Sequence, residues 1–157
     1  MSREVRMVPE NWEHPKKQPM FDESFNVAAV DWLADFDRIR AGNMTEFETE
    51  CYPHGVVEWA NDERPPDPKY YMPDWPENER THLQMYETTS EGTPISPVMK
   101  TPEELAKWLY DNGASAFGGQ TASYEGWLRV CNGGFAPSAV FTTATGVVSG
   151  VDGVGND

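Results

Sequence analysis

Residues 101–113 constrain the fold more than any other part of the chain, because they carry both a helix start and a helix stop. Thr101 is a good N-cap, and Pro102 takes the first helical position, where no backbone donor is needed. Glu104 stands where the acid of a capping box lies. Gly113 supplies the left-handed conformation that ends many helices. We therefore predict a helix that begins at Pro102 and ends just before Gly113.

The residues before this helix alternate as in a half-buried strand. From Thr81 to Thr89, one side carries Leu83, Met85 and Glu87, and the other carries His82, Gln84, Tyr86 and Thr88. The turn signals around Gly92 predict that the chain doubles back, so that residues 95–98 run alongside. Pro94 and Pro97 donate no ladder hydrogen bond, so this second strand is expected to be short or at an edge.

Apolar periodicity predicts a helix in the first third of the chain. Asp22 or Ser24 caps it, and Gly42 ends it. One stripe recurs at three- and four-residue spacing and is expected to be buried: Phe25, Ala28, Ala29, Trp32, Leu33, Phe36 and Ile39.

The C-terminal part predicts one more helix and a hairpin. The helix starts at Thr121 or Ser123 and runs to Asn132, before a pair of glycines. The β-rich runs Ala139–Thr142 and Val147–Ser149 are separated by a short turn and predict a hairpin.

In the helix that begins at Pro102, Trp108 belongs to the apolar side and is expected to be buried.

Together these elements predict an α+β fold in which about three helices pack on a small, mainly antiparallel sheet. A length of 157 residues favours a single domain, 1–157. Within it we expect residues 1–21 to form an N-terminal arm and residues 81–151 to form the α+β core. Residues 45–80 are expected to be a long loop region rich in acids, proline and aromatic side chains. Residues 56–59 are compatible with a short strand inside that loop.

Charge is the most useful guide to partners. The chain has 26 acidic and 12 basic residues, and the segment Glu46–Glu79 holds ten acids against the two bases Arg64 and Lys69. Such a surface repels a phosphate backbone, so we expect no direct binding of nucleic acid. It attracts a protein with a basic surface. The simpler alternative is that the acids only keep the protein soluble.

Aromatic residues distinguish this acidic segment from a disordered linker. Tyr70, Tyr71 and Trp75 lie among its prolines, whereas disordered acidic segments are poor in aromatic residues. Either these rings anchor the loop to the core, or they form part of a surface that binds a partner. No apolar run is long enough to span a membrane, and no signal-peptide core follows the N-terminus, so a cytosolic protein is expected.

The chain has few residues that could form a catalytic or metal site. Cys51 and His54 have the spacing of two zinc ligands, to which His14 or His82 could add a third. A nucleophile formed by Cys51 or Cys131 with His82 requires the pair to be adjacent in the fold. Scattered residues of these types arise easily by chance. We therefore expect reduced, packed cysteines, no bound metal and no cofactor.

Acid–base chemistry is a further alternative. Glu87 and Glu91 flank the turn within Thr88–Pro97, where a carboxylate pair of this kind would suit a small hydrolase or transferase. With so many acids in the chain, however, some pair always lies close in sequence. The pattern therefore favours binding over catalysis.

Four segments resemble a family of small uncharacterised proteins encoded by bacteriophages and prophages: Val8–Pro15, Tyr71–Pro76, Met85–Pro97 and Asn112–Phe117. The resemblance covers most of the chain and carries no catalytic motif. It implies a bacteriophage context and, with it, the cytoplasm of a bacterial host. Small acidic proteins of this kind often inhibit or modify host machinery, including restriction and CRISPR systems, and some imitate the charge of DNA.

These observations lead to one preferred hypothesis. The protein binds a host defence or nucleic-acid-processing protein through its basic surface, as a DNA mimic such as an anti-CRISPR or anti-restriction protein would. Self-assembly as a phage accessory protein is the other non-catalytic alternative, and the oligomeric state stays open. The candidate partner-binding residues are Asp31, Asp35, Glu58, Asp62, Glu63, Asp67, Tyr70, Tyr71, Asp74 and Trp75.

Overall fold

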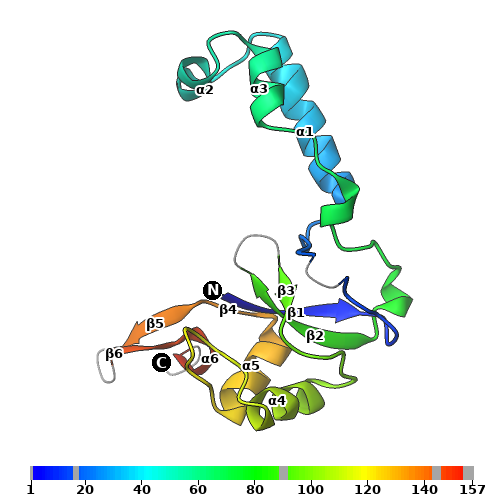
Figure 1. The fold of residues 1–157 in the computed structure, drawn as a ribbon, viewed down its shortest axis with the longest axis vertical. Helices are drawn as coiled ribbons and strands as arrows, with labels where there is room; N and C mark the ends of the chain where they lie inside the picture. The colour runs from blue at the N-terminus through cyan, green and yellow to red at the C-terminus, as the bar shows by residue number, and fades with distance from the viewer. Residues whose placement is uncertain (1, 16–17, 89–91, 143–145, 154–157) are drawn as a thin grey trace. The chain divides into compact units, whose positions relative to one another are not determined.

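The computed structural model describes residues 2–15, 18–88, 92–142 and 146–153, and its ribbon is drawn in Figure 1. The chain divides into two compact units: a sheet unit formed by Met1–Met20 with Asp74–Asp157, and a helical unit, Phe21–Pro73. The fold is α+β, as predicted, with a four-stranded antiparallel sheet. The described residues hold six α-helices, four of them of seven residues or more, where about three were expected.

The sheet has the strand order β3-β2-β1-β4. Its strands are β1 (Ser2–Val8), β2 (His82–Thr88), β3 (Thr93–Pro94) and β4 (Phe135–Ala136). The predicted alternation of β2 is confirmed, since Leu83 and Met85 belong to the core under the helices while Gln84 and Tyr86 lie on the other face. The second strand is shorter than expected: residues 95–98 form no strand, although the backbone N–H of Ile95 donates to the carbonyl of Met85.

The N-terminal segment is the main departure from the predicted architecture. Residues 1–21 were expected to be an arm, yet Ser2–Val8 forms a central strand between β2 and β4. The sequence hides this strand because Arg3 and Arg6 occupy positions that are normally apolar, and both side chains are buried. Arg3 is held by an ion pair with Glu87, its cross-strand neighbour, at 3.5 Å.

Two helices, α4 (Pro102–Asp111) and α5 (Tyr124–Gly133), pack against each other and supply half of the buried core residues (Figure 1). Both were predicted, and both caps are present: Thr101 Oγ accepts from the N–H of Glu104 at 3.2 Å, and Ser123 Oγ accepts from the N–H of Gly126 at 3.0 Å. Trp108, expected to be buried, is only half-buried.

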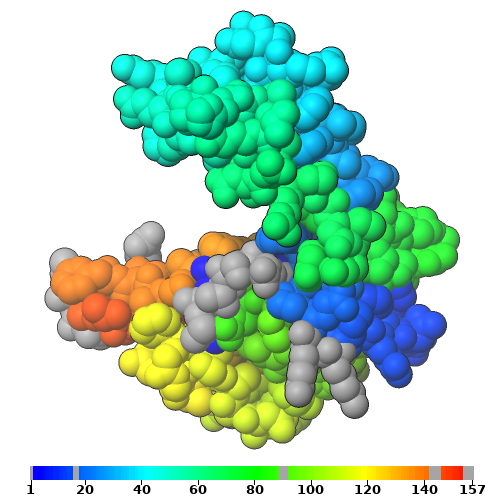
Figure 2. Space-filling view, turned by 45° about the horizontal axis from the view of Figure 1, so that its top comes forward, coloured from blue at the N-terminus to red at the C-terminus, as the bar shows by residue number. Residues whose placement is uncertain are grey.

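The predicted C-terminal hairpin is confirmed. Strands β5 (Ala139–Thr142) and β6 (Gly146–Ser149) pair antiparallel, and in the space-filling view their orange surface lies at one edge of the sheet unit (Figure 2). A short helix follows, α6 (Gly150–Gly153), which the sequence did not predict. Its Asp152 accepts hydrogen bonds from the N–H and the hydroxyl of Ser123, and so ties α6 to the start of α5.

Residues 9–15 and 18–20, together with Gly92, cover a polar network on the outer face of the sheet. Tyr86 is fully buried there, and its hydroxyl donates to Gln84 Oε1 at 2.8 Å and accepts from Trp12 Nε1 at 3.1 Å. The ring of His14 bridges this hydroxyl and the carbonyl of Gln18. The buried polar groups thus find partners within the chain, which makes this network a structural element.

Arg6 secures the same network from β1. Its guanidinium lies 4.3 Å from the centre of the Tyr86 ring, and its Nη1 donates to the carbonyl of Met20 at 2.9 Å. The N–H of Met20 in turn donates to the carbonyl of Gly92. Gly92 has a φ of +78°, and its missing side chain allows the turn to lie directly against Arg6.

The helical unit contains α1 (Phe25–Arg40), α2 (Glu46–Cys51), α3 (Val56–Asp62) and the 3₁₀ turn η1 (Pro68–Tyr70); a second such turn, η2 (Glu77–Glu79), belongs to the sheet unit. The prediction of a long loop over 45–80 was therefore wrong, as was the short strand at 56–59, which lies in α3. Thr45 and Glu48 form a complete capping box, which starts a helix regardless of the poor periodicity that follows.

Helix α1 occupies nearly the predicted range but buries a narrower stripe than predicted. Ile39 is its only fully buried residue, while Trp32 and Phe36 are half-buried and stack with ring centres 5.3 Å apart. Leu33, expected in the buried stripe, is 54% exposed, and Val30 on the same side of the helix is 64% exposed. Within its unit α1 packs mainly against α3, so its opposite side stays uncovered.

The two ends of the helical unit lie together. Phe21 forms a parallel bridge with Tyr71: its N–H donates to the carbonyl of Tyr70 at 2.6 Å, and its carbonyl accepts from the N–H of Met72 at 2.9 Å. The rings of Phe21 and Tyr71 are 5.3 Å apart. Over the described part of the chain, no helix has the length and apolar character needed to cross a membrane.

Candidate functional site

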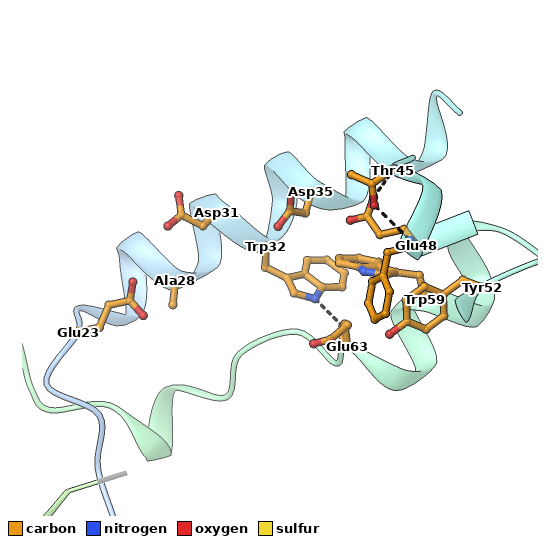
Figure 3. A pocket seen from close by; sticks show the side chains of 11 residues that line it. Glu23, Ala28, Asp31, Trp32, Asp35, Thr45, Glu48, Tyr52, Trp59 and Glu63 are labelled. Atoms are coloured by element: carbon orange, nitrogen blue, oxygen red, sulfur yellow. Dashed lines mark hydrogen bonds between the residues drawn. The ribbon is translucent and has the colours of Figure 1, made fainter. Parts of the chain in front are cut away.

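A pocket of about 490 Å³ opens between the helices of the helical unit and combines acids with aromatic rings (Figure 3). Helix α1 supplies one side, and α2, α3 and the residues that flank them supply the other. The lining residues are Glu23, Ala28, Asp31, Trp32, Asp35, Thr45, Phe47, Glu48, Tyr52, Trp59 and Glu63.

Arg38 holds one part of this lining in place. Its Nη2 donates to Glu48 Oε1 at 2.7 Å and its Nη1 to Glu48 Oε2 at 2.8 Å, a two-pronged pairing, and Asp35 Oδ1 accepts from Nη2 at 3.1 Å. Glu48 Oε2 also accepts from the backbone N–H of Thr45 at 2.8 Å. The hydrogen bonds from Arg38 and then Thr45 lower the pKa of Glu48 to about 2. They keep this carboxylate ionised and bound to the helix start.

The aromatic part of the pocket is built on Trp59, which is buried. The rings of Trp32 and Trp59 lie 5.4 Å apart, and Trp32 Nε1 donates to the backbone carbonyl of Glu63 at 2.6 Å (Figure 3). This hydrogen bond fixes the end of α3 against α1. Phe47 on α2 behaves differently, since it lines the pocket while 72% of it remains exposed to solvent.

Three carboxylates of the pocket have no cation beside them. Glu23, Asp31 and Glu63 form no ion pair or side-chain hydrogen bond with any residue that the structure describes, whereas Asp35 and Glu48 share Arg38. The pocket therefore carries an excess of negative charge next to aromatic surface. This combination is suited to a cation and unsuited to a phosphate.

The structure brings Asp31, Asp35 and Glu63 of the predicted partner-binding residues together at this pocket. Two others on α3 serve local roles. Glu58 accepts from the backbone N–H of His54 at 2.9 Å, and Asp62 accepts from the hydroxyl of Tyr52 at 3.0 Å. The hydrogen bond to Asp62 raises the pKa of Tyr52 to about 12.

Asp67, Tyr70 and Tyr71 lie at a second pocket of about 500 Å³ in the same unit. Asp67 pairs with Lys69 at 3.1 Å, and the Lys69 ammonium lies 4.8 Å from the centre of the Tyr70 ring. Tyr71 packs on Phe21. The charges at this second pocket are thus largely matched within the chain.

The last two predicted residues, Asp74 and Trp75, belong to the sheet unit. Asp74 is exposed, and Trp75 packs edge-on against Trp12 with ring centres 4.7 Å apart. Of the two roles left open for these aromatic residues, Tyr71 and Trp75 anchor their segments, while Tyr70 remains 41% exposed.

The catalytic alternatives find little support in the geometry. Cys51 and His54 are exposed in the helical unit, His14 and His82 belong to the sheet unit, and no metal-binding group of three or more His, Cys, Asp or Glu occurs among the described residues. Burial raises the pKa of Cys131 to about 12, so its thiol stays protonated and is a poor nucleophile.

The structure also gives no support to acid–base catalysis by the pair Glu87 and Glu91. Glu87 forms an ion pair with Arg3, and its partner in that hypothesis, Glu91, lies outside the described residues, as do Thr89 and Ser90 of the same turn.

The sequence analysis identified none of the four aromatic residues of the first pocket as site residues: Trp32, Phe47, Tyr52 and Trp59. One signal was available: Thr45-x-x-Glu48 matches the same capping pattern that located the helix at Pro102. This pattern would have predicted a helix starting at Glu46, although not its contact with α1. Comparison of the chain with protein-family models, with curated proteins and with solved structures gave no match.

Proposed function

We propose that the protein is a phage-encoded binding protein that inhibits or modifies a host defence or nucleic-acid-processing protein. Its helical unit binds a basic surface of that partner and occupies the place of nucleic acid, as an anti-CRISPR or anti-restriction protein would. The complex forms in the bacterial cytoplasm. The oligomeric state of the protein is not part of the proposal.

One observation carries this proposal. Five carboxylates of the helical unit have no ion pair or side-chain hydrogen bond within the described residues: Glu23, Asp31, Glu46, Glu50 and Glu63. Carboxylates that only solubilise a small domain are commonly interspersed with bases on the same surface. The helical unit holds 12 acids and 4 bases in 53 residues, whereas the sheet unit holds 14 acids and 8 bases in 104 residues, so the negative charge is denser in the helical unit. This charge produces a field that steers a positively charged partner.

The test begins with affinity purification of the tagged protein from bacteria that produce it and identification of the co-purifying protein. Binding to that protein should weaken steeply as salt rises, because exposed charges are screened beyond roughly 10 Å at 0.1 M ionic strength. Nucleic acid should displace the protein from the complex, since both occupy the same basic surface.

A pair of matched variants sharpens this test. The first changes Glu23, Asp31, Glu50 and Glu63 to lysine, and the second changes Glu10, Glu13, Glu77 and Glu79 of the sheet unit, so both end with the same net charge. The first should abolish binding and the second should preserve most of it. Binding that ignores salt and survives the first variant but is lost on changing Tyr70 would replace this proposal with an aromatic-anchored interface.

A further inference from the structure

The pocket on α1 has a composition that an acidic surface alone does not produce. Figure 3 shows Asp35, Glu48 and Glu63 beside the aromatic rings of Trp32, Tyr52 and Trp59, with Asp31 and Glu23 farther toward the start of α1. Phe47 adds an exposed ring at its rim. We infer that this pocket receives the side chain of an arginine, whose guanidinium lies against the rings and between the carboxylates. This inference rests on the proposed function, since the arginine belongs to the basic partner.

The charge of the pocket selects a cationic ligand. Arg38 already pairs with Asp35 and Glu48, although its single positive charge offsets only one of their two negative charges. Glu23, Asp31 and Glu63 remain to be matched, and a pocket of about 490 Å³ has room for one long side chain. An anionic ligand would meet like charge on several sides. A neutral ligand would leave the three carboxylates unmatched.

The aromatic wall favours guanidinium over ammonium and over a metal ion. Guanidinium is planar and weakly hydrated, stacks on aromatic faces and presents paired donors to a carboxylate, whereas the ammonium of lysine is a strongly hydrated point charge. Hard metal ions need several oxygen ligands converging on one point. The described residues contain no such group of three or more ligands.

Two arginines of the protein already make contacts of this kind, with a carboxylate and with an aromatic ring. The guanidinium of Arg38 donates hydrogen bonds to both carboxylate oxygens of Glu48, at 2.7 and 2.8 Å. That of Arg40 lies 5.8 Å from the centre of the Phe36 ring on the same helix. A second guanidinium entering the pocket would meet the same two kinds of partner, a carboxylate and a ring.

Phe47 offers an apolar surface on which the methylene groups of the arginine side chain can pack. It is a large apolar side chain that is 72% exposed, on a helix whose start is fixed by the Thr45–Glu48 capping box. Arginine carries three methylene groups before its charge, and such a stem packs on apolar surface while the head group reaches polar partners. Phe47 therefore lies where the stem would pass.

The experiment uses the full chain, labelled with nitrogen-15, and follows the indole N–H signal of Trp32 during titration with N-acetyl-arginine methylamide. The citrulline analogue has the length of arginine without its charge, and the lysine analogue carries the same charge on an ammonium group. Sodium chloride keeps the ionic strength constant throughout. We expect a saturable shift with the arginine analogue, about tenfold weaker affinity for the lysine analogue, and no saturable shift with the neutral citrulline analogue. Free arginine should bind more weakly than the blocked form, because its carboxylate faces an acidic surface.

Two double variants assign the site. Asp31→Asn with Glu63→Gln should weaken binding of the arginine analogue about tenfold, whereas Glu46→Gln with Glu50→Gln, which removes equal charge outside the pocket lining, should not. The inference is overturned if the shift does not saturate, if citrulline binds as well as arginine, or if both variants behave alike. Such a result would leave the proposed function intact if the partner still binds with steep salt dependence, because these titrations contain no partner protein.

Discussion

A substitution at Gly92 tests most directly how closely the chain packs against Arg6 and Met20 on the outer face of the sheet. A β-carbon added at this residue would lie 2.7 Å from the carbonyl oxygen of Met20 and would press on both terminal nitrogens of Arg6. The Met20 carbonyl is backbone and accepts from Arg6, so it has little freedom to move away. The φ of +78° adds a second penalty for any residue with a side chain.

Gly119 serves as a control that separates the free-energy cost of crowding from that of the left-handed backbone conformation. It has a φ of +86° in the same unit, and a β-carbon there would meet nothing within 4 Å. Gly119→Ala should therefore cost only the left-handed penalty, about 1 to 2 kcal/mol of unfolding free energy. Gly92→Ala should cost that amount and, in addition, about 1 to 3 kcal/mol for crowding in a packed region.

Urea denaturation followed by circular dichroism and by tryptophan fluorescence measures both values. The difference between the two variants is the quantity of interest, since errors in the left-handed penalty cancel. Combining Gly92→Ala with Arg6→Met should recover part of the crowding cost, because one of the two obstructing groups is then smaller. Equal destabilisation by Gly92→Ala and Gly119→Ala would refute the close approach between this turn and Arg6.

Three further predictions concern the helix cap at Thr101, the half-buried His14 and the cysteines. Thr101→Ala should lower the unfolding free energy by about 1 kcal/mol, and Thr101→Ser should restore most of it; an unchanged denaturation midpoint in the alanine variant would contradict the cap. Burial lowers the pKa of His14 below its ordinary 6.5, an effect that the charge of Arg6 adds to. The unfolded chain therefore binds the proton more readily, so the contribution of His14 to stability is complete above pH 6.5 and is lost as the pH falls through its lowered pKa. Unfolding free energies measured across this range should decline less steeply in His14→Gln, and equal slopes would contradict the prediction. Iodoacetamide should modify exposed Cys51 in the native protein but modify Cys131 only after unfolding, as mass spectrometry can verify; rapid native labelling of both would show that Cys131 is not buried.

Local signals in the sequence predicted the parts of the fold that depend on short-range chemistry. Thr101 and Ser123 locate the starts of α4 and α5, and the alternation of Leu83 to Tyr86 identifies both faces of β2. Strand β1 could not be found in this way. Its buried Arg3 and Arg6 read as surface residues until their partners, which come from distant parts of the chain, are known.

The candidate site was predicted by charge but not by shape. The acids Asp31 and Glu63 were identified because an excess of charge is visible in a sequence. Trp32 and Trp59 were not, because the pairing of α1 with α3 that brings them within 5.4 Å is a tertiary contact. A buried tryptophan and one that lines a pocket look the same in one dimension.

The bridge between Phe21 and Tyr71 bears on how the chain reaches its native state. Strands β1 and β2 are neighbours in the sheet, with Val8 opposite His82, yet the whole helical unit is synthesised between them. An unstructured connection of that length imposes an entropic cost on closure before any strand pairing is gained. Once the helical unit has folded and joined its own ends, the effective loop shrinks to the 12 residues between Val8 and Phe21 and the 10 residues between Tyr71 and His82. Early folding of the helical unit should therefore accelerate pairing of the central strands, and helical variants that leave the sheet untouched should slow its formation.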